Sequence, residues 1–125
     1  MAVARMGSIT LDCTDPRVLA EFWQGLLGGE IVHASEKFVS VRTPVMLLTA
    51  IRVADHRAPT WPEGSVPKQI HLDLVVEDLD VGVADAVRLG ARVAEDQFAP
   101  ELCRVLLDPA GHPFCLCRPR GVLAP

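Results

Sequence analysis

The sequence predicts an α+β fold built from two tandem βαβββ modules. Three observations support this prediction. The order strand, helix, three strands occurs twice, with a period of roughly 60 residues. A segment rich in proline separates the two copies, and the sequence LLGGEIV at 26–32 is echoed by RLGARVA at 88–94. Such duplications usually mark repeated structural units that pack side by side or share one sheet.

Module one is well marked in the sequence. Ser8–Cys13 alternates apolar and polar residues, which predicts a strand with one buried face. A helix is predicted over 17–27, because Asp15 is a good N-cap, Pro16 suits the first helical position and Gly28 is a typical stop. Three further strands are predicted at Glu30–Ala34, Phe38–Arg42 and Val45–Val53.

Module two repeats this order after a break. The segment 54–68 holds three prolines and a glycine and cannot continue a sheet, so it is predicted to be a linker or a lid. A strand is then expected at Gln69–Val75, followed by a helix that opens near Asp78 and ends at Gly90. The remaining strands are predicted at Arg92–Glu95, Arg104–Leu107 and Pro113–Cys117.

Length and composition restrict the domain count and the partners. We expect one domain over residues 1–125, with module one at about 7–54, the linker or lid at 55–68 and module two at about 69–118. The formal charge is −4, and the 12 basic residues are dispersed among 16 acidic ones, which excludes a basic patch for nucleic acid. The apolar runs are shorter than the roughly 20 residues of a membrane-spanning helix, and no secretory signal is evident, so we expect a cytoplasmic protein without membrane contact.

The four cysteines lie inside apolar, strand-like runs rather than in a framework of loops. In a cytoplasmic chain this placement predicts that they are reduced and buried. They are Cys13, Cys103, Cys115 and Cys117.

The duplicated order, together with the sequence DPAGHPF at 108–114, resembles the vicinal oxygen chelate superfamily of glyoxalases, bleomycin-resistance proteins and extradiol dioxygenases. Segments 11–16, 58–62, 69–73 and 108–116 are similar to the glyoxalase-like proteins of actinobacteria, and the likeness runs from Ser8 to Arg118. The resemblance implies that the modules form a curved, cup-shaped mixed β-sheet with helices on its outer face. It also implies a homodimer, with modules that pair within one chain or across two chains.

Metal-dependent members of this superfamily take two ligands from each module. His71 matches one of these positions, whereas Ser8, Cys115 and a residue within 46–48 occupy the others. Divalent cations held by oxygen and imidazole need three or more such donors to compete with water. We therefore expect no metal and no other cofactor, with His71 and Cys115 as weak metal candidates.

The resemblance also implies that the polar face of the strands forms the wall of a ligand cavity. His71 either contacts a ligand, moves a proton or forms a hydrogen bond with Asp73 or Asp12. For these two aspartates, a structural role in capping backbone N–H groups is the favoured interpretation. Trp61 in the linker either stacks on a planar ligand or pins the linker to the domain. No cluster of Arg or Lys falls on the cavity strands. The predicted ligand-binding residues are Ser8, Thr10, Asp12, Leu48, Trp61, His71, Asp73 and Cys115.

The sequence thus predicts a protein that binds or sequesters an apolar or aromatic metabolite and has a degraded metal site. The alternative is a metal-independent or metal-dependent lyase, isomerase or dioxygenase in which His71, the best catalytic candidate, moves a proton and Asp12 or Asp73 orients it. Whether the protein is an enzyme stays open at this point.

Overall fold

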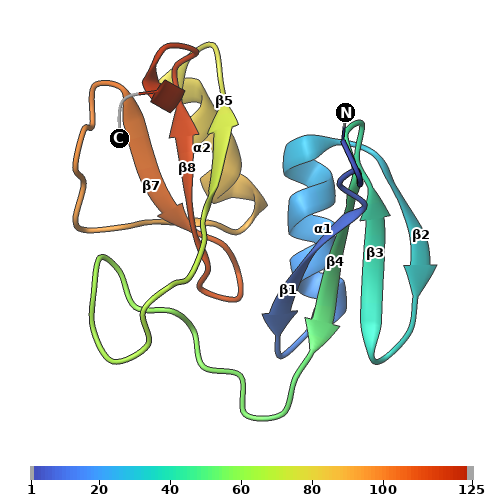
Figure 1. Cartoon of the computed structure of the whole chain (residues 1–125). Coiled ribbons are helices and arrows are strands. Elements are labelled where there is room, and N and C mark those ends of the chain that lie inside the picture. The colour runs from blue at the N-terminus through green and yellow to red at the C-terminus, as the bar shows by residue number, and fades with distance from the viewer. Residues whose placement is uncertain (1, 124–125) are drawn as a thin grey trace. The chain divides into compact units, whose positions relative to one another are not determined.

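The computed structural model describes residues 2–123, which divide after His56 into two compact units (Figure 1). Each unit is a four-stranded mixed sheet with one α-helix, so the predicted α+β fold of two tandem βαβββ modules is confirmed. No helix in the described part of the chain has the length and apolarity needed to cross a lipid bilayer.

The first unit contains β1 (Ser8–Cys13), α1 (Pro16–Leu27), β2 (Glu30–Ala34), β3 (Phe38–Arg42) and β4 (Leu47–Arg52). The sheet order is β1-β4-β3-β2, in which β1 runs parallel to β4 and the other pairs are antiparallel.

The local signals that predicted α1 form the expected contacts. Asp15 Oδ1 accepts hydrogen bonds from the backbone N–H groups of Arg17 and Val18 at 3.1 and 3.2 Å, and the N–H of Gly28 closes the last turn on the carbonyl of Gln24. The helix buries one face on β3 and β4, and Trp23 at 1% exposure is among the largest side chains of this core.

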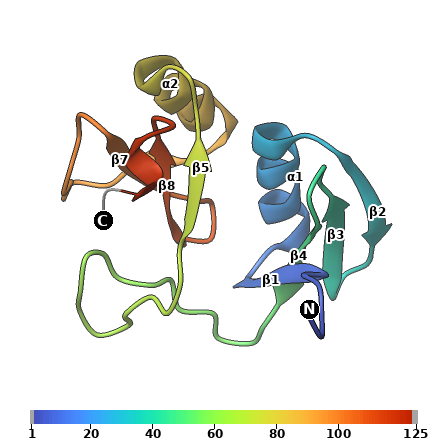
Figure 2. The same ribbon diagram turned by 45° about the horizontal axis from the view of Figure 1, so that its top comes forward.

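The second unit contains β5 (Leu72–Val75), α2 (Leu79–Leu89), β6 (Arg92–Val93), β7 (Cys103–Leu107), β8 (Pro113–Cys117) and a 3₁₀ turn, η1 (Gly121–Leu123). The sheet order is β5-β8-β7-β6, with β5 parallel to β8. Figure 2 shows α2 on one face of this sheet. Asp78 caps α2 by accepting a hydrogen bond from the N–H of Val81, and Gly90 ends it.

Strand β5 is shorter than predicted. It begins at Leu72 rather than Gln69, and Ile70 is 67% exposed. The reason lies in its partner strand, since Leu72 pairs with Phe114 and β8 itself begins at Pro113, which has no N–H to extend the ladder.

The DPAGHPF motif builds the turn that precedes β8. Asp108 is 1% exposed, and its Oδ1 accepts hydrogen bonds from the N–H groups of Ala110 and His112, both at 2.9 Å. Gly111 has φ +88°, and a Cβ there would press against the side chain of Ala58. The motif therefore has a structural task, and no catalytic role is needed to explain it.

One prediction about the cysteines is wrong. Cys103 and Cys117 form a disulfide, whereas Cys13 and Cys115 are free and buried as expected. The two bonded cysteines are direct partners in the β7–β8 register with Cα atoms 4.1 Å apart, a proximity that the spacing along the chain does not reveal.

Candidate functional site

The predicted residues of the first unit lie on two different faces. Ser8, Thr10 and Asp12 project from the exposed face of β1. Leu48, in contrast, is 2% exposed and points with Ala50 into the core beneath α1. Its expected place at a ligand site is therefore not supported. Its neighbour Thr49 takes the position beside Thr10 on the exposed face.

The face of the sheet that carries Ser8 and Thr10 also carries a short row of hydroxyl groups, which ends at the buried Ser40. Thr49 Oγ1 lies 2.8 Å from Ser40 Oγ and 3.4 Å from Ser8 Oγ, within hydrogen-bonding distance of both. The hydroxyls largely satisfy one another, and nothing in this row supplies a base or a strong metal donor.

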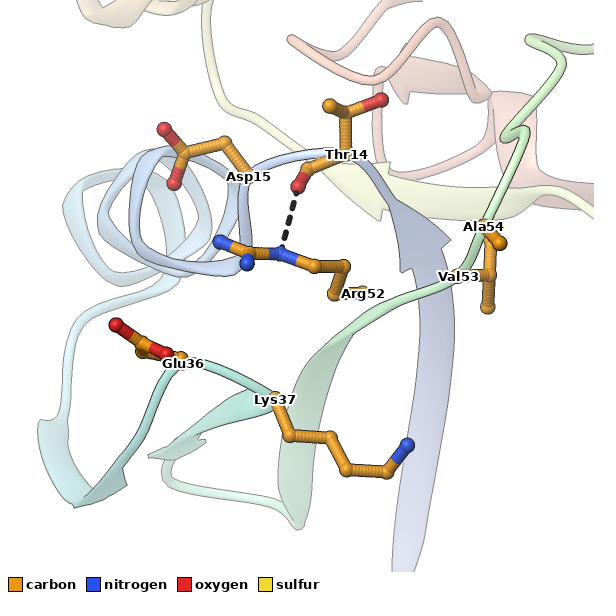
Figure 3. A pocket seen from close by; sticks show the side chains of 7 residues that line it. All are labelled: Thr14, Asp15, Glu36, Lys37, Arg52, Val53 and Ala54. Atoms are coloured by element: carbon orange, nitrogen blue, oxygen red, sulfur yellow. Dashed lines mark hydrogen bonds between the residues drawn. The ribbon is translucent and has the colours of Figure 1, made fainter.

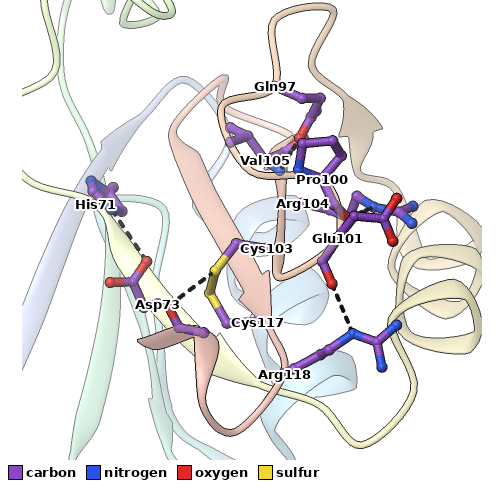
Figure 4. The surroundings of a disulfide bond; sticks show 11 residues. His71, Asp73, Gln97, Pro100, Glu101, Cys103, Arg104, Val105, Cys117 and Arg118 are labelled. Carbon is purple, nitrogen blue, oxygen red and sulfur yellow. Dashed lines mark hydrogen bonds and ion pairs between the residues drawn. A yellow bond between two sulfur atoms is a disulfide. The ribbon is translucent and has the colours of Figure 1, made fainter. Parts of the chain in front are cut away.

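Three of the predicted residues in the second unit come together. His71 lies one residue before β5, and its Nε2 is 3.2 Å from Asp73 Oδ1 (Figure 4). Asp73 is the direct register partner of Cys115 on β8, and its carboxylate accepts a hydrogen bond from the Cys115 thiol. The ligand atoms of the three side chains all lie within 4.8 Å of one another.

The surroundings of Cys115 keep its sulfur protonated. Burial, the negative charge of Asp73 and the hydrogen bond to Asp73 raise the pKa of the thiol from 9.0 to about 12, and the positive charge of Lys68 opposes this shift. At neutral pH the group is therefore a thiol that donates a hydrogen bond, and a poor nucleophile.

Trp61 fastens the proline-rich segment to the second unit. Its ring packs against the apolar cluster of Ala94, Val105 and the three cysteines 103, 115 and 117. Its indole N–H donates a hydrogen bond of 2.9 Å to the carbonyl of Asp96. The contact that would pin the linker to the domain is thus present, and one side of the ring lies next to the strand that carries Cys115.

Lys68 is a member of this site that the sequence analysis missed. Its Nζ lies 5.4 Å from the centroid of the Trp61 ring, and its charge acts on Cys115. Lys68 lies at the end of the linker, three positions before His71, and not on one of the predicted cavity strands. Its closeness in sequence to His71, the one histidine that matches a metal-ligand position of the family, could have indicated that Lys68 belongs to the site. We refer to Trp61, Lys68, His71, Asp73 and Cys115 as the His71 site.

An open cavity of about 780 Å³ lies elsewhere, in the first unit at the carboxyl ends of β1 and β4 (Figure 3). Arg52 crosses it with its Nε donating to the carbonyl of Thr14 at 3.2 Å. Two basic and two acidic side chains share the lining, so it has no dominant charge. It includes none of the predicted site residues. The lining residues are Thr14, Asp15, Glu36, Lys37, Arg52, Val53 and Ala54.

The donors of the His71 site are of kinds that bind metal ions. Imidazole, carboxylate and cysteine sulfur are all ligands of zinc, whereas the sulfur makes the set a poor match for hard ions such as Mn²⁺. Asp73 was not counted as a metal candidate in the sequence, so the set is larger than predicted. The expected absence of a metal is therefore not supported by this geometry.

Comparison with known proteins gives a consistent family. A sequence model described as a glyoxalase-like domain matches residues 8–117. No curated protein matches the chain. Among solved structures, a glyoxalase-related enzyme from Fulvimarina pelagi is 19% identical, covers 94% of this chain and 90% of its own, and has a TM-score of 0.68.

Two further structures have similar folds. A glyoxalase/bleomycin resistance protein/dioxygenase family enzyme from Burkholderia phytofirmans is 18% identical over 92% of this chain and 98% of its own, with a TM-score of 0.70. The fosfomycin resistance protein FosX from Listeria monocytogenes, in complex with Mn(II), is 14% identical over 93% of both chains, with a TM-score of 0.70. At these identities the likeness concerns the fold alone.

Proposed function

The chain belongs to the glyoxalase-like domain family, and we propose that it binds or sequesters a small apolar or aromatic metabolite at the His71 site. The observation that carries this proposal is the composition of that site. An indole ring and an apolar cluster lie beside a short chain of polar groups, His71 to Asp73 to Cys115. Binding sites for small molecules typically combine an apolar lining with a few convergent polar groups.

The test is a screen of planar apolar metabolites against the whole chain, monitored by thermal melting and tryptophan fluorescence. A ligand at 100 times its Kd adds about 2.7 kcal/mol to the free energy of unfolding, which raises Tm by several degrees. Binding should fall in His71→Ala and persist in His33→Ala, a matched change on β2 of the first unit. A screen without a single stabilising compound, or hits that His71→Ala leaves unchanged, would contradict the proposal.

One observation favours a second candidate, a lyase or isomerase. The 3.2 Å contact between His71 and Asp73 is the arrangement in which a carboxylate orients an imidazole that moves a proton. If this is the function, mass spectrometry should find a bound compound chemically altered after incubation. Asp73→Asn should slow that conversion by about 10- to 100-fold with less effect on binding, and Asp85→Asn on α2 should not change it.

A metal-dependent form of this activity would use the same residues. His71, Asp73 and Cys115 would hold a zinc-type ion, which would supply Lewis-acid polarisation of a bound oxygen. Elemental analysis of freshly purified protein, beside a titration with Zn, Ni, Mn and Fe followed by melting, tests this form. One metal ion per chain, lost in Cys115→Ala, would place the protein with the metal-dependent enzymes. No metal and no shift would leave the metal-free binder.

A further inference from the structure

Lys68 has no carboxylate within ion-pair distance in the described part of the chain. Asp73, the acidic group of the same site, is already engaged by His71 at 3.2 Å and by the thiol of Cys115. Lys68 is half-buried, and its ammonium lies over the Trp61 ring, with the Nζ 5.4 Å from the ring centroid, so its charge is met by an aromatic ring and not by a carboxylate. An anion from outside the chain would give this ammonium an opposite charge in addition to the ring.

Trp61 supplies a fixed flat surface next to this charge. Its only hydrogen-bonding group, the indole N–H, is occupied by the carbonyl of Asp96 at 2.9 Å, so the ring is held at its edge and is not available as a donor to a ligand. The segment that carries Trp61 is held by hydrogen bonds of its own, because the N–H and the hydroxyl of Thr60 both donate to the carbonyl of Val66. A ring fixed in this way suits stacking on another planar group.

The two features together define a class of ligand. From these contacts we infer that the His71 site takes a planar aromatic compound with a single carboxylate, the ring against Trp61 and the carboxylate paired with the Lys68 ammonium. The inference rests on the proposed function and specifies its ligand. The 5.4 Å between Lys68 Nζ and the ring centroid places charge and flat surface within the span of one aromatic acid.

The charge balance of the site favours a monoanion over a phosphate. One ammonium is a point charge with three donors, whereas phosphate recognition generally recruits an arginine fork or several donors. The carboxylate of Asp73 adds a negative charge near Cys115 and would repel a dianion more strongly than a monoanion. The imidazole of His71 adds a polar group that can hydrogen-bond beside the carboxylate.

The experiment compares 2-naphthoate with 2-naphthamide, which has the same ring system and no charge. Binding to the whole chain is measured by isothermal titration calorimetry and by quenching of Trp61 fluorescence, with the buried Trp23 of the first unit as the internal reference. Lys68→Met removes the charge and keeps the aliphatic stem, Lys68→Arg restores a charge, and Lys37→Met is the matched control in the first unit.

We expect 2-naphthoate to bind at least tenfold more weakly to Lys68→Met, as loss of a charged hydrogen bond generally produces. Lys68→Arg should retain most of the affinity, and the binding of 2-naphthamide should be the same in all variants. If Lys68→Met weakens both compounds equally, or neither, the inference is overturned while the proposed function stands. If neither these compounds nor any member of the metabolite screen binds, the proposed function fails and the inference falls with it.

Discussion

Cys103 on β7 and Cys117 on β8 face each other across the antiparallel ladder and are joined by a disulfide. The bond closes a loop between residues 14 apart, which contains the turn stabilised by Asp108. In the second unit it ties together the two strands on either side of that turn.

Reduction of this disulfide should lower the free energy of unfolding by about 3 kcal/mol, because the unfolded chain regains the entropy of an open loop of this length. Urea unfolding with and without a reductant measures the effect. Cys103→Ala should remove the sensitivity to reductant, whereas Cys13→Ala should keep it. Denatured, non-reduced protein should show two free thiols, those of Cys13 and Cys115, and four would contradict the pairing.

Cys115 predicts a loss of stability at alkaline pH. The unfolded chain releases the thiol proton near the ordinary pKa of 9.0, whereas the folded chain keeps it up to about 12. The free energy of unfolding should therefore fall as pH rises from about 9 to about 12, by up to about 1.4 kcal/mol per pH unit from this group. Cys115→Ala should lack this component, so the difference between the two pH profiles isolates it. Parallel profiles would show that the thiol does not titrate in this way.

Trp61 should stabilise the second unit through two separable contributions. Trp61→Phe keeps an aromatic ring and loses the donor to Asp96, which should cost about 1 kcal/mol. Trp61→Ala also removes the ring from the cysteine cluster and should cost about 3 kcal/mol. Denaturant unfolding gives both values. The matched control is Phe98→Ala, whose ring is 51% exposed and should change stability by less than about 0.5 kcal/mol.

The two glycines after α1 should respond differently to alanine. Gly28 has φ +82° with no atom near the position of a Cβ, so Gly28→Ala should cost about 1 kcal/mol from the backbone alone. Gly29 has φ +102°, and its Cβ would collide with the backbone carbonyl of Arg42. Gly29→Ala should therefore cost at least about 3 kcal/mol in thermal or chemical unfolding. Equal losses would contradict the close approach.

Local signals in the sequence were sufficient to predict the elements and their order. Asp15, Pro16 and Gly28 fixed α1, and Asp78 and Gly90 fixed α2, because capping is decided by hydrogen bonds within a few residues of chain. The alternation in β1 also correctly separated its buried and exposed faces. His71, the one histidine that matches a metal-ligand position of the family, correctly indicated the second unit as the place of the candidate site.

Which side chains of these elements contact one another depends on how the elements pack. Successive side chains of a strand point to opposite faces, so the position of β4 in the sheet decides which neighbours are buried. Leu48 lies in the core, and Thr49 faces outward. The pairing of Cys103 with Cys117 and of Asp73 with Cys115 depends on the register between strands that are far apart in sequence. Lys68 joined the site only because the linker folds back over the sheet through Trp61. Contacts of this kind are set by the packing of the whole unit, and the local sequence gives at most a hint of them, such as the closeness of Lys68 to His71.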